Sequence, residues 1–406
     1  MMNRRTFVKT GLGGMLGLWA LGARRVVAAP ARAKACILLW MNGGPSHFDT
    51  WDPKANNPIK PLATRAPGIE LAEHLPLVGE QAARLAIVRG MTSREGNHDR
   101  AQHLVHTGYS PNPTVAYPSL GSWVSEELGD PATNLPGFVA INGPSLGAGF
   151  LGVQHGPFIV PTPRQPPQNT SYARNVDMVR FLRRKSALDA LESQFLVETG
   201  DAKIKGREAV YAKAVRMMYS PRLKAFDLAE EPDAVRAAYG DSDFGRGCLM
   251  ARRLVESGVR FVEVVLDGWD THQDNFGRTR KLMGALDPGM ASLLKELDER
   301  KLLESTLVLC MGEFGRTPKL NENEGRDHHP AAWSAVLAGA GVRGGVVHGA
   351  TDATGEKVVT DPTSVADLFA TIATLLGLDP TKEFSTPRGR PITLTDNGKP
   401  IAPLLL

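Results

Sequence analysis

The feature that most constrains the fold is a mostly apolar run over residues 305–311, which ends in the polar segment GEFGRTP at residues 312–318. An apolar run without polar alternation predicts a strand that is buried on both faces. A second polar segment, GRDHHP, follows at residues 325–330. Because ligands of open α/β sheets bind outside the carboxyl ends of the strands, we expect a metal ion and an anion to be held here by residues among Glu313, Arg316, Asp327, His328 and His329.

Other apolar runs predict further strands, at residues 35–41, 85–90, 260–266 and 333–338. Apolar residues at helical spacing predict helices between and after them, at residues 99–106, 120–128, 282–300 and 361–376. For the last of these helices, Asp361 is the expected N-cap and Pro362 lies in the first turn.

Strands that alternate with helices predict an α/β fold, with a mainly parallel sheet and helices on both faces. We expect one such domain over residues 34–395, followed by a C-terminal tail at 396–406. The range 172–258 has mostly helical patterning and is interpreted as a helical insertion in that domain.

A second polar cluster follows the strand predicted at residues 260–266, where GWDTHQDN occupies residues 268–275. Carboxylates and neutral imidazoles are good ligands for Zn²⁺, Mn²⁺ and similar divalent ions. Asp270 and His272 are therefore candidate metal ligands, to be completed by His328 from the other strand end. The alternative is a solvated polar loop whose Asp caps the next helix.

The residues after the strand at 305–311 also allow two interpretations. Glu313 is a candidate metal ligand, and Arg316 can hold an anionic oxygen pair through its planar guanidinium. The alternative is a buried Glu–Arg ion pair that holds the loop. Asp327 suits a hydrogen-bond partner that orients a metal-binding His, or a simple turn cap. His329 is a further candidate ligand.

The first strand ends in NGGPSHFDTWDPK at residues 42–54. Asn42 is a candidate carbonyl ligand for a metal, Asp49 a candidate base or ligand, and Lys54 a candidate partner for an anion. A turn pinned by Asp and Pro explains the same residues. Asn97 and His98 precede the helix expected at 99–106, whose N-terminus favours anions, although a helix cap is the alternative there.

The N-terminus has the pattern of an export signal. Arg4 and Arg5 form a twin-arginine motif, an apolar stretch follows at residues 11–23, and small residues at 28–33 offer cleavage sites. We expect residues 1–33 to be removed and the rest to fold before export by the twin-arginine route, into the periplasm or beyond. The alternative is an uncleaved N-terminal anchor. After cleavage we expect no stable membrane span.

Charge and cysteine content exclude two classes of protein. The net charge of +4 includes six basic residues and no acidic ones in residues 1–33, which leaves about −2 for the remainder. A basic surface for nucleic acid is therefore not indicated. The cysteines, Cys36, Cys248 and Cys310, are far apart and fit neither a disulfide framework nor a zinc–cysteine motif.

Together, the twin-arginine leader and the motifs GGPSHFDTWDPK, GWDTHQDN, GEFGRTP and GRDHHP resemble the bacterial family catalogued as domain of unknown function 1501. The resemblance spans residues 34–395 and implies a fold related to the alkaline phosphatase and sulfatase superfamily. It implies that Asn42 stands at that superfamily's first metal ligand and His98 at its nucleophile. It also implies metal-binding roles for Asp270, His272, Glu313 and His328. No Ser, Thr or Cys stands at the nucleophile position.

We therefore carry two main hypotheses, with a transferase or mutase on the same metal site as a third. The first is an exported hydrolase of phosphate or sulfate esters that uses one or two divalent ions, with zinc, manganese, calcium and magnesium all open. Metal-activated water, or assistance by His98, would drive the reaction on an anionic small molecule or glycan ester. The second is a catalytically degenerate relative that binds an anionic glycan or a partner protein. In both, the twin-arginine translocase is a partner during export.

Overall fold

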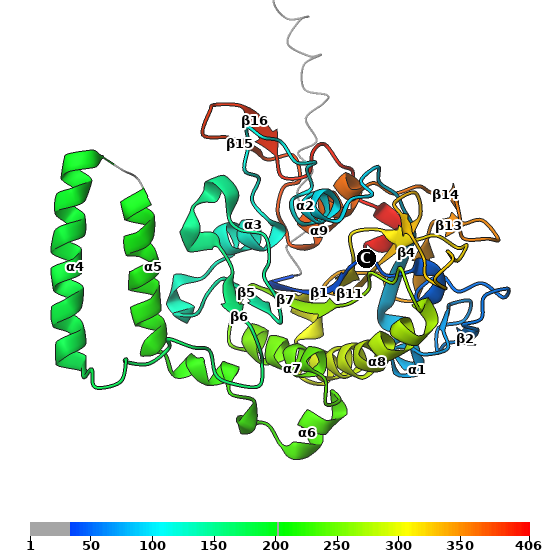
Figure 1. The fold of residues 1–406 in the computed structure, drawn as a ribbon, viewed down its shortest axis with the longest axis horizontal. Helices are drawn as coiled ribbons and strands as arrows, with labels where there is room; N and C mark the ends of the chain where they lie inside the picture. The colour runs from blue at the N-terminus through cyan, green and yellow to red at the C-terminus, as the bar shows by residue number, and fades with distance from the viewer. Residues whose placement is uncertain (1–32, 201–202) are drawn as a thin grey trace, which may run out of the picture. The chain divides into compact units, whose positions relative to one another are not determined.

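The computed structural model describes residues 33–200 and 203–406, so all but the last residue of the predicted signal lies outside the described part. An eight-stranded sheet forms the centre of the fold (Figure 1). Its strands, in spatial order, are β12 (Val346–His348), β4 (Leu85–Met91), β11 (Trp333–Gly339), β8 (Thr306–Met311), β1 (Ala35–Asn42), β7 (Phe261–Asp267), β5 (Phe138–Ile141) and β6 (Phe158–Val160).

The sheet is parallel except around β11, which is antiparallel to both β4 and β8. The predicted mainly parallel α/β fold is thereby confirmed. The strand β1 shows why: Ile37, Leu39 and Met41 belong to the core on one face, and Leu38 and Trp40 to the core on the other. A strand covered on both faces buries both sets of its side chains and is therefore mostly apolar along its length.

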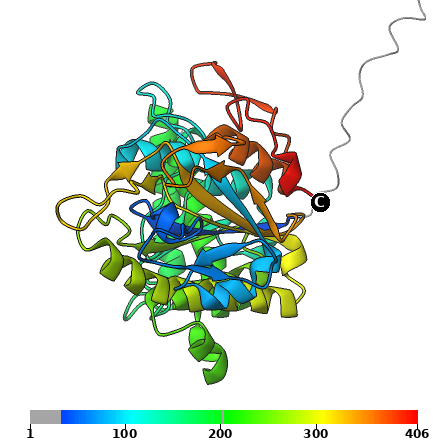
Figure 2. The ribbon, with the colours of Figure 1, turned by 90° about the vertical axis from the view of Figure 1, so that its right-hand side faces the viewer.

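Helices cover both faces of the sheet (Figure 1 and Figure 2). On one side lie α2 (His98–Thr107), α3 (Leu120–Glu127) and α9 (Val365–Leu375), and on the other side lie α1 (Pro76–Glu80), α7 (Asp243–Glu256) and α8 (Asn275–Glu299). The start of α9 differs from the prediction, because Ser364 is its N-cap and forms a capping box with Asp367.

The predicted helical insertion contains α4 (Met178–Thr199), α5 (Lys203–Met218), α6 (Asp233–Ala238) and α7. Of these, α7 packs directly against β7 and α8 and so belongs to the main core. The helix α5 packs against a 3-10 turn at Val153–His155. No helix in residues 33–200 or 203–406 combines the length and apolar character that crossing a membrane requires.

Small two-stranded sheets form within the loops. They pair β2 (Pro61–Ala63) with β3 (Glu70–Ala72), β9 (Gly315–Arg316) with β10 (His328–His329), β13 (Ala350–Thr351) with β14 (Val358–Thr360), and β15 (Glu383–Ser385) with β16 (Pro391–Thr393). The pair β9–β10 folds the loop after β8 back over the end of the sheet. At the C-terminus Leu404 is fully buried, so the segment 396–406 packs onto the same core.

Candidate metal centre

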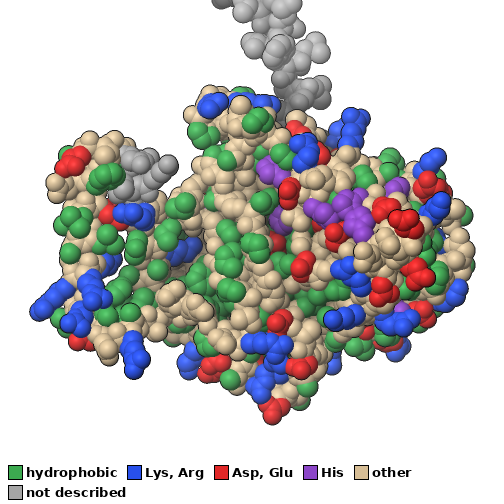
Figure 3. Space-filling view, viewed as in Figure 1, with side chains coloured by type: hydrophobic (Ala, Val, Ile, Leu, Met, Phe, Trp, Pro, Cys, Tyr) green, Lys and Arg blue, Asp and Glu red, His purple; other side chains and the backbone are tan. Residues whose placement is uncertain are grey.

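Polar side chains from three parts of the chain meet at the carboxyl end of the central strands. Asp270 and His272 follow β7, and His328 comes from β10. His98 is the first residue of α2. Figure 3 shows histidine side chains gathered on this face with acidic side chains beside them. The topology therefore brings together residues that are up to 230 positions apart in sequence (98 and 328).

Asp270 lies at the centre of this group. Its Oδ1 atom is 3.3 Å from His98 Nε2, 3.2 Å from His272 Nε2 and 3.5 Å from His328 Nε2. The ligand atoms of His98, Asp270 and His328 all lie within 4.8 Å of one another. His272 adjoins this triad, because its Nε2 is 3.0 Å from that of His328. Three imidazoles and one carboxylate thus converge.

The second nitrogen of each ring determines which atom is free to bind a metal. Each Nδ1 meets an acceptor: Glu313 Oε1 for His98 (2.7 Å), the Gly96 carbonyl for His328 (2.7 Å) and Asp327 Oδ1 for His272 (2.9 Å). Since carbonyl and carboxylate oxygens only accept, each Nδ1 carries a hydrogen, and the lone pair of the neutral ring is at Nε2. Metal-binding histidines are usually held in this way.

The donor set fits a divalent ion. His98 Nε2 is buried and makes no well-aligned hydrogen bond, although Asp270 Oδ1 lies 3.3 Å from it. Without a cation, several lone pairs and a carboxylate oxygen would face one another. A tetrahedral zinc site with bonds of about 2.0–2.1 Å separates neighbouring donors by roughly 3.3–3.4 Å, close to the separations from Asp270. Nitrogen and oxygen donors of this kind suit Zn²⁺ or Mn²⁺ better than Ca²⁺.

Neighbouring groups shift the pKa values of these candidate metal ligands. Burial opposes ionisation of Asp270, but the hydrogen bond and charge of Arg316 outweigh it and lower the Asp270 pKa to about 2. Burial lowers the pKa of His328, which favours the neutral ring that a metal needs. The hydrogen bond from His98 to Glu313 raises the pKa of His98, so a proton competes with a cation for its Nε2.

Two predicted site residues are present but occupy outer positions. Glu313 is fully buried and accepts hydrogen bonds from His98 and from the Gly43 amide (3.0 and 3.2 Å), so it orients a ligand. Arg316 is also fully buried. Its guanidinium donates to Asp270 (2.6 Å), to the backbone carbonyls of Gly43, Gly44 and Arg326, and at 3.4 Å to His272 Nε2. With its donors occupied, Arg316 holds Asp270 in place and does not match the anion-binding role expected for it.

Asp49 differs most from its expected role as a base. It is fully buried and accepts hydrogen bonds from Arg326 Nε (2.7 Å), Asn57 (2.6 Å) and Asn275 (2.8 Å). This network joins the loops after β1, β7 and β8. Asp49 therefore holds the loops that carry the site and has no open face for a substrate.

Three more candidates are bound elsewhere. Lys54 pairs with Asp52 at 3.0 Å. The Asn97 side chain caps α2 by accepting from the Arg100 amide at 3.3 Å. Asn42 accepts from Trp40 and Gln102 and donates to Asp267, which ties the end of β1 to its neighbours. In each case a polar partner nearby in the fold uses the group that was expected to bind a ligand.

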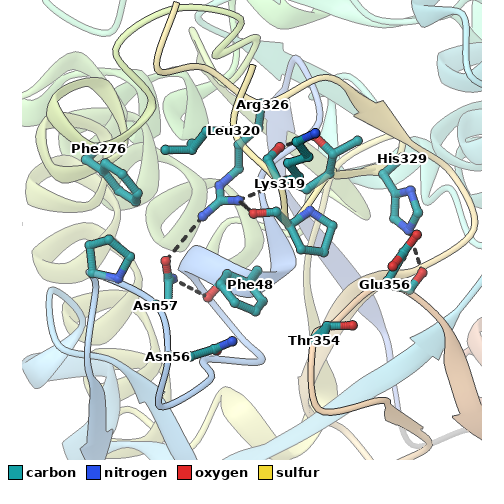
Figure 4. A pocket seen from close by; sticks show the side chains of 13 residues that line it. Phe48, Asn56, Asn57, Phe276, Lys319, Leu320, Arg326, His329, Thr354 and Glu356 are labelled. Carbon is teal, nitrogen blue, oxygen red and sulfur yellow. Dashed lines mark hydrogen bonds between the residues drawn. The ribbon is translucent and has the colours of Figure 1, made fainter. Parts of the chain in front are cut away.

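His329 points away from the metal candidates. Successive residues of a strand point to opposite sides, so His328 faces the cluster while His329 Nε2 donates to the Glu356 carbonyl at 2.7 Å. His329 thereby lines a separate cavity of about 510 Å³, with Phe48, Asn57, Phe276 and Lys319 among the other lining residues (Figure 4). The sequence contains no pattern that predicts this cavity.

Solved structures that this chain resembles have low sequence identity to it. They include the lipoteichoic acid synthase LtaP from Listeria monocytogenes (10% identity, TM-score 0.40, covering 86% of this chain and 73% of that one). Another is the PsFucS1 sulfatase from Pseudoalteromonas sp. (14%, 0.38, 86% and 68%). A third is a protein in the alkaline phosphatase superfamily from Vibrio parahaemolyticus (11%, 0.38, 93% and 72%).

No curated protein matches the sequence. A family model, in contrast, matches residues 33–405, nearly the whole described chain. Its description is a protein of unknown function, DUF1501. This match agrees with the resemblance carried by the four sequence motifs, and the chain belongs to the DUF1501 family.

Proposed function

We propose that this protein is a metal-dependent hydrolase of phosphate or sulfate esters. The observation that carries the proposal is the convergence of three imidazole Nε2 atoms on the Asp270 carboxylate, each imidazole being held at Nδ1 by an acceptor. A neutral His cluster of this kind around an anion has the chemistry of a cation site. We propose His98, Asp270, His272 and His328 as the residues that hold the ion.

Some of these residues would bind the ion, and others fix the orientation of the histidines that bind it. When bound, a divalent ion supplies Lewis-acid chemistry, which lowers the pKa of water and polarises an ester oxygen. Asp270 supplies the negative charge, which its low pKa keeps available at all physiological pH values. Glu313 and Asp327 hold the Nδ1 protons of His98 and His272, so both rings present Nε2.

Two observations about the site favour water as the attacking group. The side chains of Asp270 and His272 are 45% and 43% exposed, so a substrate can reach them. Within residues 33–200 and 203–406, no Ser or Thr hydroxyl and no Cys thiol is hydrogen-bonded to His98, Asp270, His272 or His328. We therefore propose direct hydrolysis of the ester by water, without a covalent enzyme intermediate on a hydroxyl.

We further propose that the protein is exported in the folded state by the twin-arginine route and acts outside the cytoplasm. The twin-arginine motif at Arg4 and Arg5 supports this proposal. Folding before export would let the site load its ion inside the cell. The substrate would then be an anionic small-molecule or glycan ester of the cell envelope or its surroundings.

A second candidate function is binding without chemistry. The residue at the expected nucleophile position is His98, and its Nδ1 is engaged by Glu313. A relative that had lost its nucleophile could keep the ion and hold an anionic glycan without turnover. This candidate predicts saturable binding of a sulfated or phosphorylated glycan and no product.

Turnover by the purified protein, loaded with Zn²⁺ or Mn²⁺, on a panel of phosphate and sulfate esters separates the two candidates. Asp270→Ala should abolish both metal binding and turnover. The matched control is Asp298→Ala, because Asp298 is 43% exposed and, like Asp270, has a 2.6 Å ion pair with an arginine. Turnover that survives Asp270→Ala would refute the hydrolase proposal, and metal binding without turnover would favour the second candidate.

A further inference from the structure

One face of α2 carries three polar side chains at helical spacing. His98, Gln102 and His106 are four residues apart, so they lie one above another on the same side of the helix. This side faces the central sheet, since Val105 and the neighbouring His106 are buried. Only His98 belongs to the proposed metal site, which leaves the other two polar side chains without a role in it.

Each of the three side chains is bonded to a different part of the sheet. His98 bonds to Glu313 after β8 (2.7 Å), Gln102 donates to Asn42 at the end of β1 (2.7 Å), and His106 lies 3.2 Å from Glu263 within β7. Three attachments along one helix face fix both the rotation of α2 about its axis and its position along that axis. Both determine where His98 Nε2 points.

The innermost attachment is a buried ion pair. His106 and Glu263 are 6% and 1% exposed, in a layer of apolar side chains that includes Trp40. His106 Nδ1 donates to the Gln102 carbonyl (2.9 Å) and its Nε2 to Glu263. Because both partners accept, the ring carries two hydrogens and a positive charge. The pKa of His106 is raised, since Glu263 outweighs the opposing effect of burial.

A buried ion pair adds little to the stability of a fold, because desolvation offsets most of the attraction between its charges. It is strongly directional, however, and Glu263 is itself fixed by a 2.5 Å hydrogen bond from Ser145 Oγ. These properties suit a group that holds a helix in one orientation.

We propose that Glu263 is a positioning residue for the metal centre: through His106 it fixes α2 so that His98 Nε2 faces Asp270. The proposal rests on the proposed metal site. Glu263 touches neither the ion nor the substrate. We expect its effect on metal binding to pass through α2 and His98.

The test compares zinc affinity in Glu263→Gln and in a control, Glu231→Gln, by competition with a chromophoric chelator. Glu231 is also a buried carboxylate, 7% exposed, that pairs with Arg252 at 2.8 Å, but it lies away from α2. We expect Glu263→Gln to weaken zinc binding about 10-fold, the lower end of the effect of outer partners of metal ligands. We expect Glu231→Gln to leave zinc affinity unchanged at a comparable loss of thermal stability.

A double-mutant cycle with His98→Ala tests the route of the effect. In the His98→Ala background, Glu263→Gln should change zinc affinity less than 2-fold, because the ring that it positions is absent. Equal zinc affinity of wild type and Glu263→Gln, or the same 10-fold loss in the His98→Ala background, would overturn the positioning role while the metal site stands. Failure of the wild-type protein to bind zinc would overturn the metal site, and the positioning role with it.

Discussion

Replacing Glu313 by Gln tests the link between an outer residue and the proposed metal ligand. Glu313 uses one oxygen, Oε1, to accept from both His98 Nδ1 (2.7 Å) and the Gly43 amide (3.0 Å), and its Oε2 lies 3.2 Å from the same amide. Gln has the same size but places an NH₂ group where one oxygen was. In either orientation that group opposes the Gly43 amide, because both are donors and both oxygens of Glu313 lie within 3.2 Å of that amide.

The backbone at Gly43 cannot adjust easily, since its φ is +110° and a Cβ there would lie 2.4 Å from the Asp270 amide. With the NH₂ at the Oε1 position, His98 would have to accept at Nδ1 and carry its hydrogen on Nε2, the atom proposed to bind the metal. With the NH₂ at the Oε2 position, His98 Nδ1 keeps only an uncharged amide oxygen as its acceptor, and the NH₂ lies against the Gly43 amide. Both arrangements weaken the group that holds His98. The variant should lose affinity by about 10- to 100-fold, or roughly 1.4–2.7 kcal/mol.

The assay is zinc competition against a chelator at pH 7.5, with thermal unfolding of the metal-free protein measured in parallel. Glu192→Gln is the control, because Glu192 is 2% exposed and pairs with Arg207 at 2.6 Å far along the chain from the site. Unchanged zinc affinity in a folded Glu313→Gln protein would refute the role of Glu313 in holding His98 for metal binding.

Three other predictions follow from the geometry around the site. Gly43→Ala should weaken zinc binding at least as much as Glu313→Gln, because its Cβ would displace Asp270 and a positive φ costs a further ~1–3 kcal/mol. Asp49→Ala should lower the free energy of unfolding by roughly 3–5 kcal/mol, measured by urea titration, because it leaves Arg326 charged, buried and unpaired; a stable, folded and inactive variant would contradict the structural role. Burial lowers the pKa of His47 from 6.5 to about 4, so on acidification the unfolded chain takes up a proton before the folded one. The free energy of unfolding should therefore be highest above pH 6.5 and fall by up to about 3 kcal/mol as the pH drops to 4. His47→Gln should flatten that slope, and an unchanged slope would contradict it.

The strands were predictable because their burial leaves a strong pattern. The run at residues 305–311 corresponds to β8 (Thr306–Met311), and that at 35–41 to β1 (Ala35–Asn42). A fully apolar run has no polar face that would indicate its direction or neighbours, so the antiparallel setting of β11 could not be inferred. Asp361 and Pro362 favour a helix start in the sequence, but Asp361 has a φ of +47° and the Ser364 capping box begins α9.

For the site, the sequence indicated which polar residues follow the strand ends. It did not indicate which groups from other parts of the chain form hydrogen bonds with them. Asp270, His272, His328 and His98 were singled out from motif and helix position, and the fold places them together. Glu313 orients His98 because the fold places α2 and the Gly43 amide beside it. The N–H groups of Arg316 are occupied because three backbone carbonyls lie within hydrogen-bond distance of its guanidinium. The Gly96 carbonyl that holds His328 leaves no trace in the sequence, since any residue supplies a carbonyl.

X-ray absorption spectroscopy of the purified protein, with elemental analysis of the same sample, would show whether the proposed metal centre exists. We expect at least one tightly held divalent ion per chain, nitrogen and oxygen neighbours at about 2.0–2.1 Å, and the outer-shell scattering of two or three imidazole rings. Asp270→Ala should lose the ion, and Asp298→Ala should keep it. A protein that holds no ion after incubation with zinc or manganese, or one whose bound ion shows no imidazole scattering, would contradict the metal centre.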